Sequence, residues 1–137
     1  MGRPRRLTIP GRYNKIRRAC AFVVAGAKKA GLDQKAIDDV ELACDEACSN
    51  VIEHAYEGEG RGPIEVSWQV QDQSFVITVR DRGRPFNPDG VATPHIDPDD
   101  LKIGGLGLHF MRQVMDQVSF SFNENHGNTL VMVKRIA

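Results

Sequence analysis

The sequence predicts an α+β fold: a two-layer α/β sandwich in which a mixed, mostly antiparallel sheet carries three helices on one face. The first observation behind this prediction is the order of the segments, β-α-α-β-β-loop-α-β-β, in which helices interleave with hairpins. The second is the length, because 137 residues suit one domain with its own hydrophobic core. We find no internal repeat and no linker, so we expect residues 1–137 to form a single domain.

Two helices are expected after a short first strand at Leu7–Ile9. From Asn14 to Ala30, apolar residues recur at three- and four-residue steps, which is the period of an amphipathic helix. Gly31 is expected to end this helix. Asp33 then has the character of an N-cap for a second helix at Gln34–Tyr56.

The second half of the chain predicts two hairpins and one further helix. Ile64–Val70 alternates apolar and polar residues, and Phe75–Val79 returns as the partner strand. A third helix is expected at Leu106–Asp116, followed by strands at Val118–Phe122 and Thr129–Val133. Between the halves lies a Pro- and Gly-rich loop, residues 83–105; loops of this length are usually functional or disordered.

Composition and charge exclude some classes of protein. The longest apolar run, Ala19–Ala27, is about half of the ~20 residues that a membrane-spanning helix needs, and we see no secretion signal, which favours the cytoplasm. Nine of the 18 Lys and Arg residues precede Asp33, the first acidic residue. This basic segment is either a surface for an acidic partner or the solvated face of the first helix.

Three cysteines provide neither an even disulfide framework nor a C-x-x-C pair. Cys44 and Cys48 are four residues apart and therefore share a helical face, where a metal site is conceivable. Buried free thiols are the commoner outcome, and we expect that one.

The stretch Asp45–Glu57 (DEACSNVIEHAYE) combines a packing face of alanines with many hydrogen-bonding side chains. Glu46, Asn50 and Glu53 are spaced at i, i+4 and i+7, which places them on one face of a helix. His54 lies one step off that line, and a structural role is expected for it. Because polar helix faces are common, this spacing alone does not distinguish a binding site from a solvated surface.

A second motif, VRDRGRPFNP (Val79–Pro88), places Asp81 at the end of an expected strand. An aspartate there can accept a hydrogen bond from an amine such as the adenine N6 group. Gly83, two residues later, lacks a Cβ and would let the backbone approach a flat ring. The same residues would also suit an ordinary Asp-x-Gly turn.

A third motif, GGLGLHFMRQ (Gly104–Gln113), places glycines at the start of the third expected helix. Exposed amides at a helix N-terminus carry partial positive charge and attract phosphate. The spacing matches neither a Walker A loop nor a Rossmann fingerprint.

Taken in this order, the three motifs resemble those of the GHKL ATPase superfamily. The forms EACSNVIEHAY, DRGRPFNP and GGLGLHFMRQVMD are similar to those of the anti-sigma factor serine/threonine kinases of the RsbW type. The resemblance runs from Ile9 to the last strand. It implies the histidine kinase-like ATPase fold, with ATP and Mg²⁺ as cofactors and with residues 87–103 as the ATP lid.

The resemblance also implies roles for individual residues. Asn50 matches the asparagine that holds Mg²⁺, and Glu46 matches the presumed general base. Asp81 matches the adenine-binding aspartate, and Gly83 matches the glycine under the ring. Lys102 in the expected lid is a candidate nucleotide contact. The segment that meets the phosphates corresponds to Gly105, Leu106, Gly107 and Leu108.

One departure from the superfamily pattern is Pro85, which stands where a second glycine often follows Asp-x-Gly. The kinase subfamily commonly tolerates this change, so we do not interpret it as loss of ATP binding.

The leading hypothesis is an ATP-dependent protein serine/threonine kinase that acts as an anti-sigma factor. Such kinases phosphorylate an anti-sigma factor antagonist, bind a sigma factor and act as homodimers. The alternative is a nucleotide-binding regulatory module of the same fold without phosphotransfer, which would not need a base such as Glu46. A histidine-phosphorylating sensor fragment is less favoured, because the chain has no separate helix pair bearing a phospho-accepting histidine. Direct nucleic-acid binding is also less favoured, because no recognisable motif is present.

Overall fold

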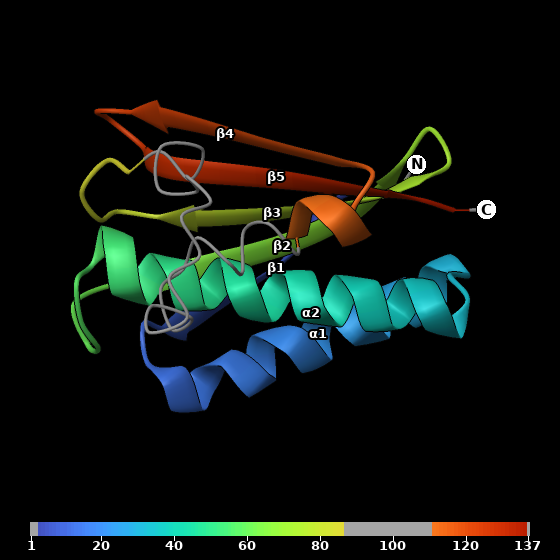
Figure 1. Cartoon of the computed structure of the whole chain (residues 1–137), viewed down its shortest axis with the longest axis horizontal. Coiled ribbons are helices and arrows are strands. Elements are labelled where there is room, and N and C mark those ends of the chain that lie inside the picture. The colour runs from blue at the N-terminus through green and yellow to red at the C-terminus, as the bar shows by residue number, and fades with distance from the viewer. Residues whose placement is uncertain (1–2, 87–110, 137) are drawn as a thin grey trace.

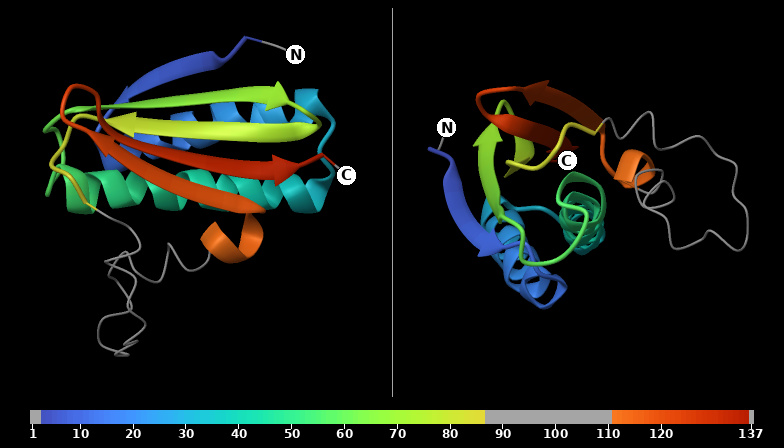
Figure 2. Two further views of the ribbon diagram at one scale, coloured as in Figure 1. Left: turned by 90° about the horizontal axis from the view of Figure 1, so that it is seen from above. Right: turned by 90° about the vertical axis from the view of Figure 1, so that its left-hand side faces the viewer.

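The fold is an open five-stranded antiparallel sheet with helices on one face (Figures 1 and 2). The structure, a computed structural model, describes residues 3–86 and 111–136. The strand order is β1-β2-β3-β5-β4. The strands are β1 (Arg5–Pro10), β2 (Pro63–Gln71), β3 (Ser74–Asp81), β4 (Gln117–Asn123) and β5 (Gly127–Arg135).

All four strand pairings are antiparallel, so among the described strands the sheet lacks the parallel pairing that a mixed sheet would include. Two of the pairings are hairpins, which are antiparallel by construction. The pairing of β1 with β2 is antiparallel because the two intervening helices return the chain to the end of the sheet where β1 finishes. Pro10 there lies opposite Pro63, and the amide of Gly11 donates to the carbonyl of Gly62 at 2.9 Å.

The two long helices are α1 (Ile16–Ala30), preceded by a 3-10 turn η1 (Tyr13–Lys15), and α2 (Gln34–Asn50). Gly31 ends α1 in the left-handed conformation at φ 92°, as expected for a C-terminal glycine. The side chain of Asp33 caps α2 by accepting from the Ala36 amide at 2.9 Å. The expected continuation to Tyr56 is not α-helical, because the chain widens into a π-helical turn, η2 (Val51–Ala55).

The hydrophobic core lies between the helices and the covered face of the sheet. Alternate strand residues enter it, and α1 approaches the sheet closely at Gly26, where an added Cβ would lie 2.3 Å from the Trp68 ring. Cys20, Cys44 and Cys48 are free thiols within this core, as expected. The largest fully buried side chains include Phe75, Ile9, Ile52, Ile64, Ile77, Met111 and Met132.

The third expected helix is described only in part. Residues 111–114 are helical, and Met111 and Met115 are buried against the core, whereas residues 106–110 and the expected lid at 87–103 lie outside the described residues. No helix within residues 3–86 and 111–136 has the length and apolar character needed to cross a membrane.

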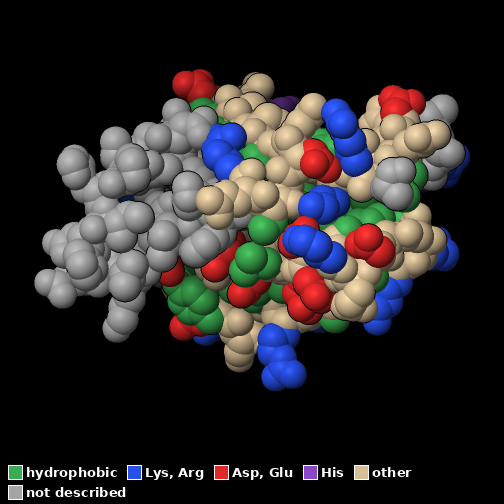
Figure 3. Space-filling model, turned by 45° about the vertical axis from the view of Figure 1, so that its right-hand side comes forward, with side chains coloured by type: hydrophobic (Ala, Val, Ile, Leu, Met, Phe, Trp, Pro, Cys, Tyr) green, Lys and Arg blue, Asp and Glu red, His purple; other side chains and the backbone are tan. Residues whose placement is uncertain are grey.

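The surface carries both signs of charge. On the face shown in Figure 3, Lys and Arg side chains are interspersed with Asp and Glu side chains. Arg80 forms a partly exposed pair with Glu65 at 3.3 Å, and the exposed Lys35 pairs with the buried Asp39 at 3.4 Å. This face therefore shows no large field of a single sign, despite the uneven distribution of charge along the sequence.

Candidate functional site

The widened turn at the end of α2 joins the first motif to the second. In η2 the Tyr56 amide donates to the Val51 carbonyl at 2.9 Å, a step of five residues rather than four. The turn leaves two carbonyls for partners outside the helix. The carbonyl of Ala55 accepts from the backbone amide of Arg84 at 2.9 Å, and the carbonyl of His54 accepts from the Nε of Arg84 at 2.8 Å. The end of β3 is thereby held against the end of α2.

Gly83 is required by this junction. A Cβ at Gly83 would lie 2.5 Å from the carbonyl oxygen of Ala55, which is backbone and cannot move aside. The Gly83 amide donates to Oδ1 of Asp81 at 2.8 Å. The motif therefore does form an Asp-x-Gly turn, and this turn fixes the carboxyl group of Asp81.

Asn128 on β5 is a site residue that the sequence did not identify. It lies opposite Asp81 in the β3–β5 register, and its Nδ2 donates to Oδ1 of Asp81 and to the carbonyl of Arg84, both at 2.9 Å. Because both partners are acceptors, the orientation of the amide is fixed. The available signal was a polar residue on the same face of β5 as Leu130 and Met132, both buried in the core.

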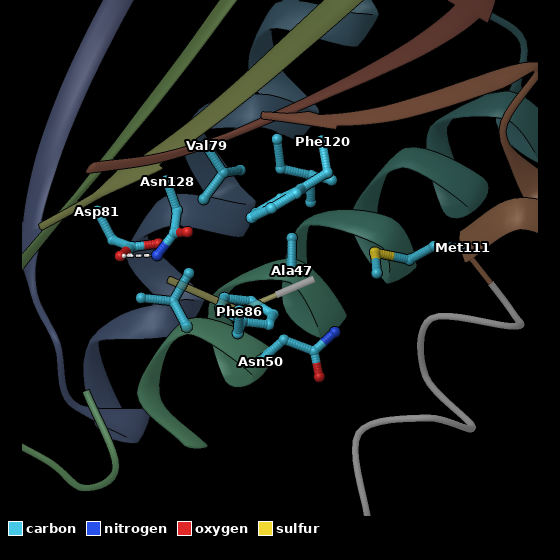
Figure 4. A pocket seen from close by; sticks show the side chains of 10 residues that line it. Ala47, Asn50, Val79, Asp81, Phe86, Met111, Phe120 and Asn128 are labelled. Atoms are coloured by element: carbon cyan, nitrogen blue, oxygen red, sulfur yellow. Dashed lines mark hydrogen bonds between the residues drawn. The ribbon is translucent and has the colours of Figure 1, made fainter. Parts of the chain in front are cut away.

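These elements enclose a pocket between α2 and the sheet (Figure 4). Asp81 and Asn128 lie at one end, Asn50 lies at the other, and Phe86 lies between them. The cavity that remains is about 10 Å³, roughly the space for one water molecule. The lining residues are Ala47, Asn50, Val51, Val79, Asp81, Phe86, Met111, Phe120, Asn128 and Leu130.

Apolar walls with a few polar groups at the ends suit a flat ring that carries hydrogen-bonding groups. The Phe86 ring occupies much of the space, with its centroid 5.6 Å from that of Phe120 and 5.8 Å from that of His54. A flat ligand therefore requires Phe86 to move. His54 packs on this ring, and its buried Nε2 has no hydrogen-bond partner among residues 3–86 and 111–136.

The two ends of the pocket differ in the polar groups they offer. Within the described residues, both hydrogen bonds to Asp81 end on Oδ1, which leaves Oδ2 for a further donor. Oδ1 of Asn128 is buried and has no hydrogen-bond partner in the described part of the chain. This end therefore presents acceptors, and it suits a ligand that carries an amino group.

Two carboxyl groups at or near the pocket, those of Asp81 and Glu46, have raised pKa values. Burial raises the pKa of Asp81 above its usual 3.8, and the hydrogen bonds from Asn128 and Gly83 oppose the shift. Burial also raises the pKa of Glu46 above 4.5, and the negative charges of Asp45 and Glu53 add to the effect. Glu46 is thus a stronger base than an ordinary glutamate.

The structure brings Asn50 and Asp81 to one pocket, although they are 31 positions apart in the printed sequence. Glu46 lies one turn before Asn50 on α2; it is half-buried and does not line the pocket.

The described residues contain no group of three or more His, Cys, Asp or Glu able to hold a metal ion. A single asparagine oxygen remains compatible with Mg²⁺, which usually keeps waters and phosphate oxygens in its shell. The remaining candidates, Lys102, Gly105, Leu106, Gly107 and Leu108, lie outside the described residues.

The fold and the pocket define a class of protein. The chain belongs to the histidine kinase-like ATPase family, because that family's model, described as histidine kinase-like ATPase domain, matches residues 9–134. The expected resemblance to the RsbW type is confirmed as well. The chain is 35% identical over 114 residues to the serine-protein kinase RsbW of Bacillus velezensis. The aligned region covers 79% of this chain and 70% of the relative. The chain is 34% identical over 115 residues to RsbW of Bacillus subtilis, with coverage of 79% and 70%.

Solved structures agree on the fold. A structure of the RsbU and RsbW domains of a Mycobacterium tuberculosis protein superposes with a TM-score of 0.70 at 20% identity, over 98% of this chain and 33% of that one. The catalytic domain of the histidine kinase ThkA superposes with a TM-score of 0.60 at 14% identity, over 96% of each chain. The predicted α+β sandwich is therefore confirmed.

Proposed function

We propose that this protein is an ATP-dependent protein serine/threonine kinase that acts as an anti-sigma factor. The observation that carries the proposal is the convergence of Asn50 and Asp81 on one pocket, with Glu46 one turn away, in a chain similar to serine-protein kinases. Its substrate protein is an anti-sigma factor antagonist, and its binding partner is a sigma factor. We further propose that it works as a homodimer, as the resemblance implies, and in the cytoplasm, as the sequence favours.

The base of ATP is recognised at the acceptor end of the pocket. Oδ2 of Asp81 accepts from the exocyclic amine, and the buried Oδ1 of Asn128 provides a second acceptor nearby. The flat purine takes the space that Phe86 now fills between the apolar walls. Gly83 contributes by letting the end of β3 lie close to η2, which fixes the direction of the Asp81 carboxyl group.

The triphosphate lies toward Asn50. The side-chain oxygen of Asn50 would hold Mg²⁺, which would neutralise charge on the phosphates during transfer. Glu46 accepts the proton of the attacking serine hydroxyl as that oxygen bonds to the γ-phosphorus and the bond to the β-phosphate oxygen breaks. ADP leaves, and phosphoserine forms on the antagonist. The raised pKa of Glu46 suits a group that must accept a proton near neutral pH.

The second candidate is a nucleotide-binding module that does not transfer phosphate. The protein is incubated with γ-labelled ATP and an antagonist protein encoded beside it. Label on a serine or threonine of the antagonist, lost in Glu46→Ala and kept in Glu41→Ala, supports the kinase. Glu41 is a matched control because it is an exposed glutamate on the same helix. Tight ATP binding without label on the antagonist would establish the module instead.

Base recognition is tested separately with inosine triphosphate, which has a carbonyl oxygen where ATP has the amine. The acceptor oxygens of Asp81 and Asn128 would then face the carbonyl oxygen of the ligand without a hydrogen between them. We therefore expect inosine triphosphate to bind more weakly than ATP, by roughly 100-fold or more. Equal affinity for the two nucleotides would refute the assignment of Asp81 and Asn128 while leaving phosphotransfer open.

A further inference from the structure

The side chain of Tyr56 joins three segments of the chain that meet at one end of the sheet (Figure 1). Tyr56 directly follows η2 and is only 8% exposed. Its hydroxyl donates to the carbonyl of Pro63, the first residue of β2, and accepts from the amide of Arg82 at 3.0 Å. A hydroxyl has one hydrogen and two lone pairs, so it makes both contacts at once. The end of η2 is thereby tied to the start of β2 and to the chain that leaves β3.

Close packing holds the Tyr56 ring in place. A Cβ added at Gly62 would lie 2.5 Å from the ring, so the backbone before β2 is in direct contact with it. That backbone is itself fixed, because the carbonyl of Gly62 accepts from the amide of Gly11 at 2.9 Å. The direction of the hydroxyl is therefore defined by packing as well as by its hydrogen bonds.

The amide that donates to the Tyr56 hydroxyl is the first one after Asp81. The second, of Gly83, donates to Oδ1 of Asp81 at 2.8 Å, and the third, of Arg84, donates to the carbonyl of Ala55 at 2.9 Å. Two of these three acceptors lie at the end of η2. The contact with Tyr56 fixes the peptide plane that directly follows Asp81, and with it the backbone from which the carboxyl group projects.

We propose that Tyr56 is a positioning residue that sets how strongly the pocket prefers adenine to a base without the amine. The inference rests on the proposed function, in which Oδ2 of Asp81 accepts from that amine. Hydrogen bonds weaken when their direction changes, so a carboxyl group that is free to tilt would bind the amine less well. Tyr56 does not line the pocket, and its loss therefore leaves the apolar contacts with a flat ring in place.

The test measures the affinities of Mg-ATP and of Mg-inosine triphosphate, by calorimetry and by competition. Tyr56→Phe keeps the ring and removes only the hydroxyl. We expect ATP to bind about tenfold more weakly to the variant, and inosine triphosphate affinity to change by less than about twofold. The preference for ATP, roughly 100-fold or more in the unmodified protein, should fall accordingly. Tyr13→Phe is the matched control, because it removes the hydroxyl of the other tyrosine, which is exposed and donates to Glu53 at 3.3 Å. It should leave both affinities unchanged.

Gly62→Ala replaces Tyr56→Phe if that variant does not fold. Its new Cβ would displace the ring and carry the hydroxyl away from Arg82, so the same loss of preference is expected. Equal weakening of both nucleotides would mean that Tyr56 only stabilises the fold, and unchanged affinities would mean that it positions nothing; both results overturn the inference. If the unmodified protein binds the two nucleotides equally, the proposed recognition of the amine fails and the inference fails with it. If the unmodified protein prefers ATP and the variant keeps the same preference, the inference alone fails.

Discussion

Asn128 provides the sharpest test of the pocket, through the substitution Asn128→Ala. The change removes a hydrogen bond to the buried carboxyl group of Asp81 and another to the carbonyl of Arg84, both 2.9 Å long. A hydrogen bond to a charged group contributes about 1.5–3 kcal/mol and one to a neutral group about 0.5–1.5 kcal/mol. We therefore expect the free energy of unfolding to fall by about 2–4 kcal/mol.

The assay is urea unfolding followed by circular dichroism. With a slope of about 2 kcal/mol per molar urea, which is typical of a small domain, the midpoint should fall by roughly 1–2 M while the slope stays constant. Asn125→Ala is the matched control, because Asn125 is exposed in the same hairpin and its hydrogen bonds to the described residues use only its backbone atoms. If Asn128→Ala lowers the free energy of unfolding no more than Asn125→Ala does, the hydrogen bonds from Asn128 to Asp81 and Arg84 do not stabilise the site.

The pH dependence of this effect follows from the shifted pKa of Asp81. Burial raises that pKa above 3.8, and the hydrogen bond from Asn128 opposes the shift, so the variant should have a still higher pKa in the folded state. The variant therefore keeps its proton to a higher pH. The loss of stability should be complete where Asp81 is ionised in both proteins, and it should shrink as the pH falls through the folded-state pKa values. A loss that is independent of pH would contradict this coupling.

Three further outcomes are expected. Gly83→Ala should lower the free energy of unfolding by about 1–3 kcal/mol in thermal or urea melts, because the new Cβ meets the Ala55 carbonyl at 2.5 Å; an unchanged melt would mean that β3 and η2 are not in contact. Asp45→Asn should move the acidic limb of the kinase pH–rate profile to lower pH, because the negative charge of Asp45 raises the pKa of Glu46; an unmoved limb would show that another group titrates. Asp33→Ala should cost about 0.5–2 kcal/mol in the same melts through loss of the α2 cap, without altering nucleotide specificity; a changed specificity would contradict a purely capping role.

Local signals predicted most of the fold. The apolar period of α1, the glycine at its end and the aspartate before α2 each act within a few residues, and each is found as expected. The strand at Leu7–Ile9 is longer than expected, running from Arg5 to Pro10, because its ends are defined by pairing with β2. Composition alone does not reveal that pairing, since arginines and a proline are poor strand signals.

The site was predictable where a motif lies on one element and was missed where it depends on distant contacts. Asn50 and Asp81 were identified from separate motifs, and the structure places both on one pocket. The π-helical turn was not foreseen, because its freed carbonyls are satisfied by Arg84, 30 positions away from His54. Asn128 was missed because a single polar residue in a strand has no local signature, and only its partner across the sheet explains it.

Because β3 and β5 are neighbours in the sheet, the contact between Asp81 and Asn128 does not depend on the length of the chain segment that joins the two strands. Asp81 and Asn128 are 47 positions apart in the chain, yet the sheet sets them opposite one another. Each doubling in length of the intervening segment would cost only about 0.6 kcal/mol in closure entropy. Because the β3–β5 pairing holds the carboxyl and amide groups opposite one another, a change in the length of the intervening segment would leave their register intact.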